Sequence, residues 1–411
     1  MPIPSVLVLA GDVGGTNARF ALSEVVDGDK KSTVSLFDKD YPTGEGCFTD
    51  VLRQFMSDAA AALDVLEDGW WESTPPSAVC LAIAGPIDYA HNSTRLTNDR
   101  NGDNSWDISA QGIADSIEGL DADRIKLIND FSAIGYGIPG LNSTTDIATL
   151  FQGTSDPSAP IAIVGAGTVG AGTGLGMGYA MQQYQYIFIY IYVCVCVCLG
   201  MGYAMQQESG WTVYPSEGGH APFAPISDPE FKFTHWLMRE HPTGVPLERV
   251  SWERIASGIG LRDLFYFYRS YYARSTDCIS PQLAGAVAEA EAEGRDVNPL
   301  VSSAARASAC HPLPVGEADP VALHTMHTFV RVFAAASLGM ALTVLPKQGL
   351  YLAGGISPRL LDFLSCPETG FVQAFHTAGR LRHQVENIPI HVILNDRVGL
   401  LGASLYAASL I

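Results

Sequence analysis

Hydrophobic residues follow two kinds of spacing along the first third of the chain. Short apolar runs are typical of buried strands, whereas apolar residues that recur every three or four positions are typical of a helix packed on a core. The helical spacing covers residues 48–66. The apolar runs lie at 5–10, 18–24, 33–37, 78–83 and 125–128. This alternation predicts an α/β domain.

The spacing becomes mainly helical after residue 228. The expected helices are 231–239, 259–272, 283–293 and 320–345, followed by a strand at 349–353, a helix from 358, a strand at 389–394 and a last helix from 399. A final strand and helix can return to the first domain, which predicts two lobes with a cleft between them. We expect a smaller α/β lobe of 1–140 plus about 388–411, and a larger α/β lobe with added helices at 141–387.

Residues 165–207 contain a duplication. The segment LGMGYAMQQ occurs at 175–183 and again at 199–207, and Gly-Ala-Gly-Thr is doubled just upstream. Between the copies the chain reads YQYIFIYIYVCVCVC, which alternating AT and GT dinucleotides encode. We interpret 175–198 as an anomalous insertion from a retained intron or a gene-model error, not as a structural repeat. The alternatives are a strand that is apolar on both faces, a membrane span at 186–205 and a cysteine zinc site.

Composition and charge narrow the classes of function. A chain of 411 residues with 47% hydrophobic and 16% charged residues is typical of a folded protein of two or three domains. Its net charge of −19 repels nucleic acid and anionic membrane surfaces, so neither is an expected partner. An anionic ligand such as ATP then needs backbone N–H groups and a divalent cation around it. The first residues lack the pattern of a signal peptide, and the scattered cysteines favour reduced thiols in the cytoplasm.

The most informative local motif is a glycine-rich turn between the first two expected strands. Glycines let the backbone approach a phosphate closely and point N–H groups at it. Asp12 is placed to hold a water of hydrated Mg²⁺, and Thr16 adds a hydroxyl donor. Taken alone, the motif is equally compatible with a tight hairpin. Its residues are Gly11, Asp12, Val13, Gly14, Gly15, Thr16 and Asn17.

A second glycine-rich turn and a carboxylate follow further along. The turn Gly172-Thr173-Gly174 comes after another apolar strand, and two such turns favour two lobes that hold ATP from both sides. Asn129-Asp130 ends the strand that begins at residue 125. A carboxylate there faces the crevice where α/β sheets bind ligands, and a helix cap is the alternative role.

Eight segments, taken in order, closely resemble bacterial-type glucokinase, a hexokinase-like family of the actin and sugar-kinase superfamily. They cover nearly the whole chain outside the duplication: GDVGGTNARFAL, LAIAGPI with LTN, LINDFSA, GAGTGLG, SEGGHAPFAP, RIASGIGL, YLAGGISPRLL and VGLLGAS. The resemblance implies a two-lobed actin-like ATPase (ribonuclease H-like) fold with the active site in the interdomain cleft. It also implies phosphorylation of glucose at the 6-hydroxyl by ATP with Mg²⁺, giving glucose 6-phosphate and ADP.

The resemblance further implies a role for each matching residue. Asp130 would be the general base that takes the proton of the sugar 6-hydroxyl. The sugar-binding residues would be Asn98, Asn129, Glu217, His220 and Glu253. The ATP-binding residues would be Gly11, Asp12, Val13, Gly14, Gly15, Thr16, Gly172, Thr173, Gly174, Ser257, Gly258, Gly354 and Gly355. Such a set supplies the positioning and charge neutralisation that phosphoryl transfer requires.

Two departures from the family pattern leave alternatives open. Extra residues at 99–104 separate the LTN segment from Trp106, and the duplication lies inside the second phosphate turn, which puts the activity of this exact chain in question. The alternative functions are a kinase for another hexose and a non-catalytic sugar- or nucleotide-binding protein of the same fold. The sequence leaves the oligomeric state open, with a homodimer as one expectation.

Overall fold

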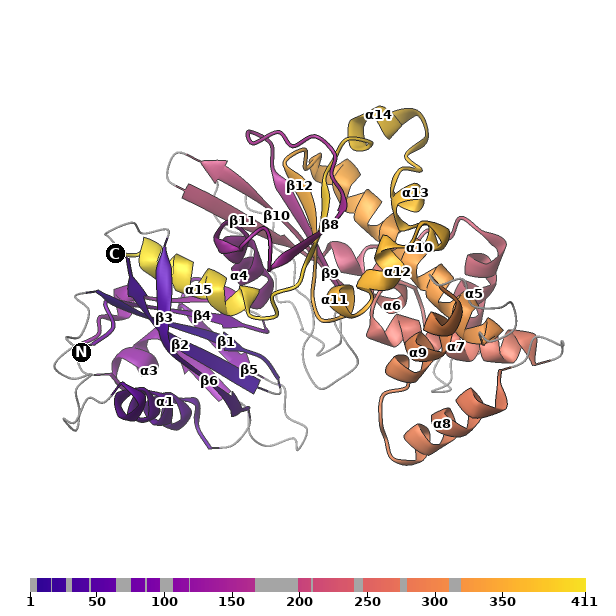
Figure 1. Ribbon diagram of the computed structural model, residues 1–411. Coiled ribbons are helices and arrows are strands. Elements are labelled where there is room, and N and C mark those ends of the chain that lie inside the picture. Colours follow the sequence, from indigo (N-terminus) through magenta and orange to yellow (C-terminus); the bar gives the residue numbers. More distant parts are fainter. Residues whose placement is uncertain are drawn as a thin grey trace.

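Two β-sheets, one in each of two lobes, carry the fold (Figure 1). The structure is a computed structural model. It describes residues 6–15, 17–26, 32–43, 46–63, 75–85, 87–96, 106–117, 119–166, 199–207, 210–239, 247–273, 279–309 and 319–411.

The first sheet has the strand order β3-β2-β1-β4-β7. Its central strands β1, β4 and β7 are parallel, and β2 and β3 extend it as antiparallel strands. Every residue of β4 is buried, as expected for a parallel strand covered on both faces. The bounds are β1 Leu7–Val13, β2 Asn17–Val25, β3 Thr33–Pro42, β4 Ala78–Ile83 and β7 Ile125–Asn129.

Helices cover both faces of this sheet. On one face lie α1, Phe48–Ala62, and α3, Ala110–Ala114. On the other lies the last helix of the chain, α15, Val398–Ser409, whose apolar residues join those of β1 and β4 in one buried cluster. In Figure 1 this helix is the yellow one against the first sheet. A separate pair of strands, β5 Ser93–Leu96 and β6 Trp106–Ser109, adds to the same lobe.

The second sheet has the strand order β11-β10-β9-β12-β13-β8. Strand β10, between β9 and β11, is the second copy of the duplicated LGMGYAMQQ segment. The first copy and the rest of 175–198 lie outside the described residues. The copy at 199–207 therefore supplies the strand that completes this sheet. The bounds are β8 Ile147–Phe151, β9 Ile161–Ala166, β10 Leu199–Gln207, β11 Gly210–Ser216, β12 Gly349–Ala353 and β13 Ile390–Ile393.

Helices pack against the second sheet around the largest apolar core. The long helix α10, Pro320–Val344, is the one described helix that is long and apolar enough to cross a membrane, and 56% of its most apolar window is buried. The membrane span considered as an alternative at 186–205 reaches the described residues only in strand β10. The other helices are α5 Asp228–Arg239, α6 Trp252–Ile255, α7 Gly258–Tyr272, α8 Pro281–Ala292, α9 Asn298–Ala309, α11 Ile356–Arg359, α12 Leu361–Ser365, α13 Phe371–Phe375 and α14 Arg382–Val385.

The chain crosses between the two sheets at two places. The first crossing follows helix α4, Asp130–Gly137, and leads into β8. The second lies between β13 and α15. Strand β13 therefore pairs in the second sheet, whereas the predicted boundary at about residue 388 assigned it to the smaller lobe. The two crossings touch, because the N–H of Leu394 donates to the carbonyl of Asp146 at 2.7 Å.

Helices α4 and α15 meet with their backbones in contact, which only glycine permits. A Cβ atom on Gly402 would lie 1.8 Å from the carbonyl oxygen of Ala133, and one on Gly137 would lie 2.3 Å from that of Val398. These distances are far below van der Waals contact. The crossing therefore fixes the two interlobe helices against each other.

Three details differ from the sequence expectations. Strand β1 continues to Val13, so Gly11 and Asp12 belong to the strand and the turn begins at Gly14. The helix expected from residue 358 begins at Ile356, directly after a glycine pair. Cys366 is disulfide-bonded rather than reduced, whereas Cys47 and Cys80 are free thiols.

We expect Gly402→Ala to lower the free energy of unfolding by about 3 kcal/mol, because the added methyl group must push α4 and α15 apart. Gly339→Ala is the matched control, since Gly339 also lies within a helix but has open space where the Cβ would be. That substitution should raise stability by up to about 1 kcal/mol. Urea unfolding of both variants measures the difference, and equal effects would contradict the proposed backbone contact.

Candidate active site

The first glycine-rich motif forms the tight connection between β1 and β2. The N–H of Gly14 donates to the carbonyl of Asn17 at 2.9 Å, and the hydroxyl of Thr43 donates to the carbonyl of Gly14 at 2.9 Å. A Cβ on Gly11 would lie 2.6 Å from the Leu81 side chain, so close packing requires this glycine. Thr16 lies outside the described residues.

Asp12 lies at the end of β1, beside the first turn of α15. Its Oδ2 is 3.3 Å from the position that a Cβ on Gly399 would occupy. Burial raises the pKa of the Asp12 carboxyl, Arg19 opposes that rise, and Asp40 adds to it. Arg19 is directly opposite Asp12 in the β1–β2 register. The N-terminus of a helix favours a carboxylate, so α15 and Arg19 both stabilise negative charge at this point.

Asp130 is the first residue of α4 and directly follows strand β7. The carbonyl oxygen of the Asn129 side chain accepts the N–H groups of Phe131 and Ser132 at 3.0 and 3.3 Å, so Asn129, not Asp130, is the N-cap. Burial and then the charge of Asp12 raise the pKa of Asp130 to about 7, against hydrogen bonds that lower it. A carboxyl with that pKa can accept a proton near neutral pH.

The aromatic ring of Phe131 fixes the start of α4 on the second sheet. A Cβ on Gly165 of β9 would lie 2.8 Å from this ring, and a Cβ on Gly202 of β10 would lie 3.2 Å from it. The ring therefore occupies space that both glycines leave free. Since Phe131 follows Asp130 directly, this contact places the carboxyl at the junction of the two lobes.

A second group of ionisable side chains surrounds His220. Its Nδ1 lies 2.6 Å from Oε2 of Glu253, and its Nε2 lies 3.4 Å from Oε2 of Glu217. Glu253 is 8% exposed. Burial raises the pKa of Glu217 to about 7, His220 opposes the rise, and Glu253 adds to it. Carboxylates and an imidazole held together in this way can donate to and accept from several hydroxyl groups.

Backbone contacts hold this group in place. The Arg249 guanidinium donates to the carbonyl of His220 at 2.6 Å, and the N–H of Trp252 donates to the carbonyl of Ala221 at 3.0 Å. Ser251 caps the short helix that carries Glu253 by accepting the N–H of Arg254. The loop after β11 and helix α6 therefore act as one support.

Strand β10 connects the His220 group to Asp130. Met201 pairs with Ser216, the residue before Glu217, and the next residue of β10, Gly202, contacts the ring of Phe131. Two groups that are far apart in the sequence thus flank the start of one strand. That strand is the second copy of the duplicated segment.

A cavity of about 270 Å³ lies in the second lobe, beside the remaining predicted ATP-binding residues. Ser257 caps α7 and is fully buried, and the Asn298 amide donates to the carbonyl of Gly258 at 2.8 Å. Gly354 has a φ of +80°, and a Cβ atom on it would lie 2.5 Å from the carbonyl oxygen of Ala166. Together with Gly355 it leads into α11. The lining includes Leu261, Asn298, Ser302, Ile356 and Leu360.

The structure therefore brings the predicted residues into three neighbouring groups, around Asp12 and Asp130, around His220, and around Ser257 and Gly354. Asn98, Gly172, Thr173 and Gly174 lie outside the described residues. Sequence reasoning missed Arg249 and the α9 residues of the cavity, because nothing in their local sequence distinguishes them from surface residues. It also missed a role for Arg19, although this residue lies in the GDVGGTNARFAL segment that carries the family resemblance.

The chain is similar to known proteins over nearly its whole length. A family model described as Glucokinase matches residues 9–191 and 196–410. A protein named glucokinase from Nostoc sp. is 33% identical over 98% of this chain and 99% of its own length. One from Cronobacter sakazakii is 29% identical over 96% of this chain and 95% of its own length.

Solved structures show the same fold. A glucokinase from an Antarctic psychrotroph has a TM-score of 0.66 at 24% identity and covers 97% of this chain and 98% of its own. A Balamuthia mandrillaris glucokinase in complex with glucose has a TM-score of 0.67 at 17% identity and covers 98% of this chain and 93% of its own. A Streptomyces griseus ROK-family glucokinase in complex with glucose and AMPPNP has a TM-score of 0.52 at 16% identity, with 97% of this chain and 98% of its own covered. The two-lobed actin-like architecture is thereby confirmed.

We expect Glu217→Gln to stabilise the protein above neutral pH. The folded protein keeps the Glu217 proton up to about pH 7, whereas the unfolded chain loses it near its ordinary pKa. Glu217 therefore favours folding at low pH, and this contribution is lost as the pH rises through about 7. Melting temperatures at pH 4 and pH 8 measure the change, with the exposed Glu289→Gln as control. A variant that gains no stability relative to the parent between the two pH values would contradict the expected shift.

Proposed function

The chain belongs to the glucokinase family and phosphorylates glucose with ATP, and we propose that the reaction takes place at Asp130, between Asp12 and the His220 group. The observation that carries this proposal is the position of Asp130, directly after β7 and beside Phe131, whose ring contacts the second sheet. Burial and the charge of Asp12 raise the pKa of Asp130 there to about 7. A carboxyl that loses its proton near neutral pH is suited to general base catalysis.

In the proposed reaction Asp130 takes the proton of the sugar 6-hydroxyl as that oxygen attacks the γ-phosphorus of ATP. The bond between the γ-phosphorus and the bridging oxygen breaks, so that glucose 6-phosphate and ADP result. Phosphoryl transfer depends mainly on in-line positioning and charge neutralisation. The negative charge of Asp12, which raises the Asp130 pKa, makes Asp130 a stronger base.

The remaining hydroxyl groups of glucose would be bound by Asn129, Glu217, His220 and Glu253, with Asn98 as a further donor. Three of these side chains already form one hydrogen-bonded group. A site built to pair with several hydroxyl groups rejects a sugar that lacks one of them, since buried polar groups are then left without partners. We propose that this pairing makes glucose a better substrate than other hexoses.

The nucleotide would lie across both lobes. We propose that the adenosine occupies the cavity beside Ser257, Gly258, Gly354 and Gly355, and that the phosphates reach the turn from Gly11 to Thr16 and the turn Gly172-Thr173-Gly174. The apolar residues Leu261, Ile356 and Leu360 in the mixed lining of this cavity support the placement, as do the glycines that admit a close backbone approach. Mg²⁺ fits the site because hard cations prefer carboxylate oxygens and water. Asp12 would hold it through water, and the ion would neutralise phosphate charge.

Taken by itself, the insertion 175–198 inside the second phosphate turn would favour a non-catalytic binding protein of the same fold. The complete second sheet supports the enzyme, since strand β10 is in place. We also propose a cytoplasmic location with no membrane or nucleic-acid partner, and a homodimer as the assembly. The free, exposed thiol of Cys47 supports a reducing compartment, and the disulfide at Cys366 is the observation against it.

We expect glucose-dependent ADP release whose kcat rises with pH and levels off above about pH 7, as Asp130 loses its proton. Asp130→Asn should lower kcat by about 10²- to 10⁴-fold, the usual contribution of a general base. The assay compares a panel of hexoses, for the chain as it is and for a version without 175–198 and one Gly-Ala-Gly-Thr copy. If neither version responds to any hexose, or if Asp130→Asn has the same rate, the proposed mechanism is wrong.

We expect chelation of divalent cations to abolish ADP release and added Mg²⁺ to restore it. Asp12→Asn should raise the Mg²⁺ concentration needed for half-maximal activity by about tenfold or more, because the carboxylate that would hold a water ligand of the ion is lost. Titration of Mg²⁺ at saturating glucose and ATP measures this shift. An unchanged Mg²⁺ dependence in Asp12→Asn would show that Asp12 does not hold the ion.

A further inference from the structure

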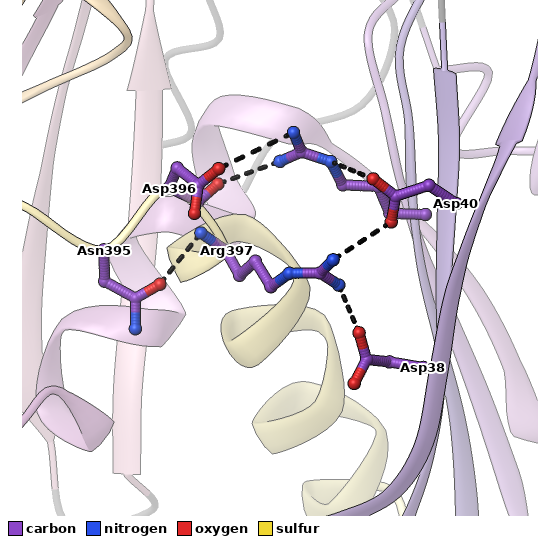
Figure 2. A network of polar contacts seen from close by, with 6 residues as sticks. Asp38, Asp40, Asn395, Asp396 and Arg397 are labelled. Atoms are coloured by element: carbon purple, nitrogen blue, oxygen red, sulfur yellow. Dashed lines mark hydrogen bonds and ion pairs between the residues drawn. The ribbon is translucent and has the colours of Figure 1, made fainter.

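The second interlobe crossing carries a network of charged side chains on its solvent side (Figure 2). The guanidinium of Arg397, at the start of α15, pairs with Asp38 and Asp40 on β3. Figure 2 shows these carboxylates on one side of Arg397 and Asn395 on the other. The Asn395 side chain accepts the backbone N–H of Arg397 at 2.8 Å, which shapes the turn before the helix.

Arg19 on β2 extends the network to the turn itself. Its Nη1 donates to the carbonyl of Asp396 at 3.0 Å, its Nη2 lies 3.8 Å from the Asp396 carboxylate, and its Nε lies 3.5 Å from Asp40. Asp40 therefore pairs with both arginines. Strands β2 and β3 hold the turn before α15 through two guanidinium groups rather than one.

Apolar packing also holds α15 on the sheet, because Leu400 and Ala403 join Val8, Ala10 and Ala21 in one buried cluster. A cavity of about 160 Å³ lies between strands β2 and β3 and the first turns of the helix. Its lining combines polar side chains with apolar ones: Ser23, Asn395 and Ser404, and Ala21, Leu400 and Leu401. On its other side α15 rests on α4 through the glycine contacts. The start of α15 is thus held by backbone contact with α4, by apolar packing on the sheet, and by the charges of Arg19 and Arg397 beside the cavity.

The same helix turn lies against the Asp12 carboxylate. Gly399, two residues after Arg397, approaches Oδ2 of Asp12, and Arg19 is opposite Asp12 across β1 and β2. A shift of the first turn of α15 would therefore change the surroundings of Asp12. A displacement of about 1 Å at a reacting group can reduce a rate by about 10²-fold.

We propose that Arg19 and Arg397 are positioning residues that clamp the start of α15 to β2 and β3 and so hold Asp12 in the geometry that phosphoryl transfer needs. This proposal rests on the function proposed for Asp12 above. Part-exposed ion pairs add little to stability, so the clamp acts on geometry more than on folding.

Arg397 tests the clamp more directly than Arg19. The Arg397 guanidinium pairs with Asp38 and Asp40, whereas Arg19 also interacts electrostatically with Asp12, so a change at Arg19 would affect Asp12 in two ways. We expect Arg397→Met to lower kcat by at least tenfold, with the KM for glucose changed by less than about threefold and the melting temperature by a few degrees. Arg397→Lys should keep part of the activity, since it retains the charge but not the two-pronged pairing. The matched control is Arg53→Met, which breaks the exposed Arg53–Asp50 pair at 2.9 Å in the same lobe.

A double-variant cycle and hydrogen exchange complete the test. Asp38→Asn combined with Arg397→Met should be no slower than Arg397→Met alone, and amide exchange in the first two turns of α15 should rise at least tenfold in Arg397→Met but not in Arg53→Met. Additive losses of kcat, or exchange that stays at the parent level, would overturn the clamp. If the parent chain releases no ADP with any hexose, the proposed function fails, and the exchange measurement still decides whether the clamp exists.

Discussion

The contact between the backbones of α4 and α15 is the constraint on which the rest of the site depends. Gly137 and Gly402 let the two helices approach so closely that a methyl group on either would overlap a carbonyl oxygen. Asp130 stands at the start of α4, and the start of α15 lies against Asp12. The crossing joins α4 to α15, and the Phe131 ring and the charges of Arg19 and Arg397 complete the placement of the two carboxylates relative to each other.

The closeness of those carboxylates creates the chemistry. Each is part-buried, and the charge of Asp12 raises the pKa of Asp130 beyond the effect of burial alone. Two carboxylates placed near each other repel, which costs stability. The same repulsion gives the site a base with a pKa near neutrality. Arg19 and the start of α15 limit that cost at Asp12, so the two carboxyls differ in their surroundings and can take different roles.

The duplicated segment shows how a sheet can tolerate an unusual sequence. The two copies of LGMGYAMQQ are identical, so either one offers the same alternation of side chains to the neighbouring strands. The structure uses the copy at 199–207, which pairs with both β9 and β11. Gly202 of that copy accommodates Phe131, and the copy thereby joins the active-site region as well as the sheet.

The sequence alone determined the α/β class, most of the strands and helices, the family resemblance and the chemical types of the site residues, because these depend on local spacing and on short motifs. It could not place His220 between Glu217 and Glu253, assign the N-cap to Asn129, or set the pKa of Asp130. Those properties depend on which distant segments pack together. The backbone crossing at Gly402 and the pairing of Arg397 with β3 join residues more than 250 positions apart, so only the tertiary structure decided them.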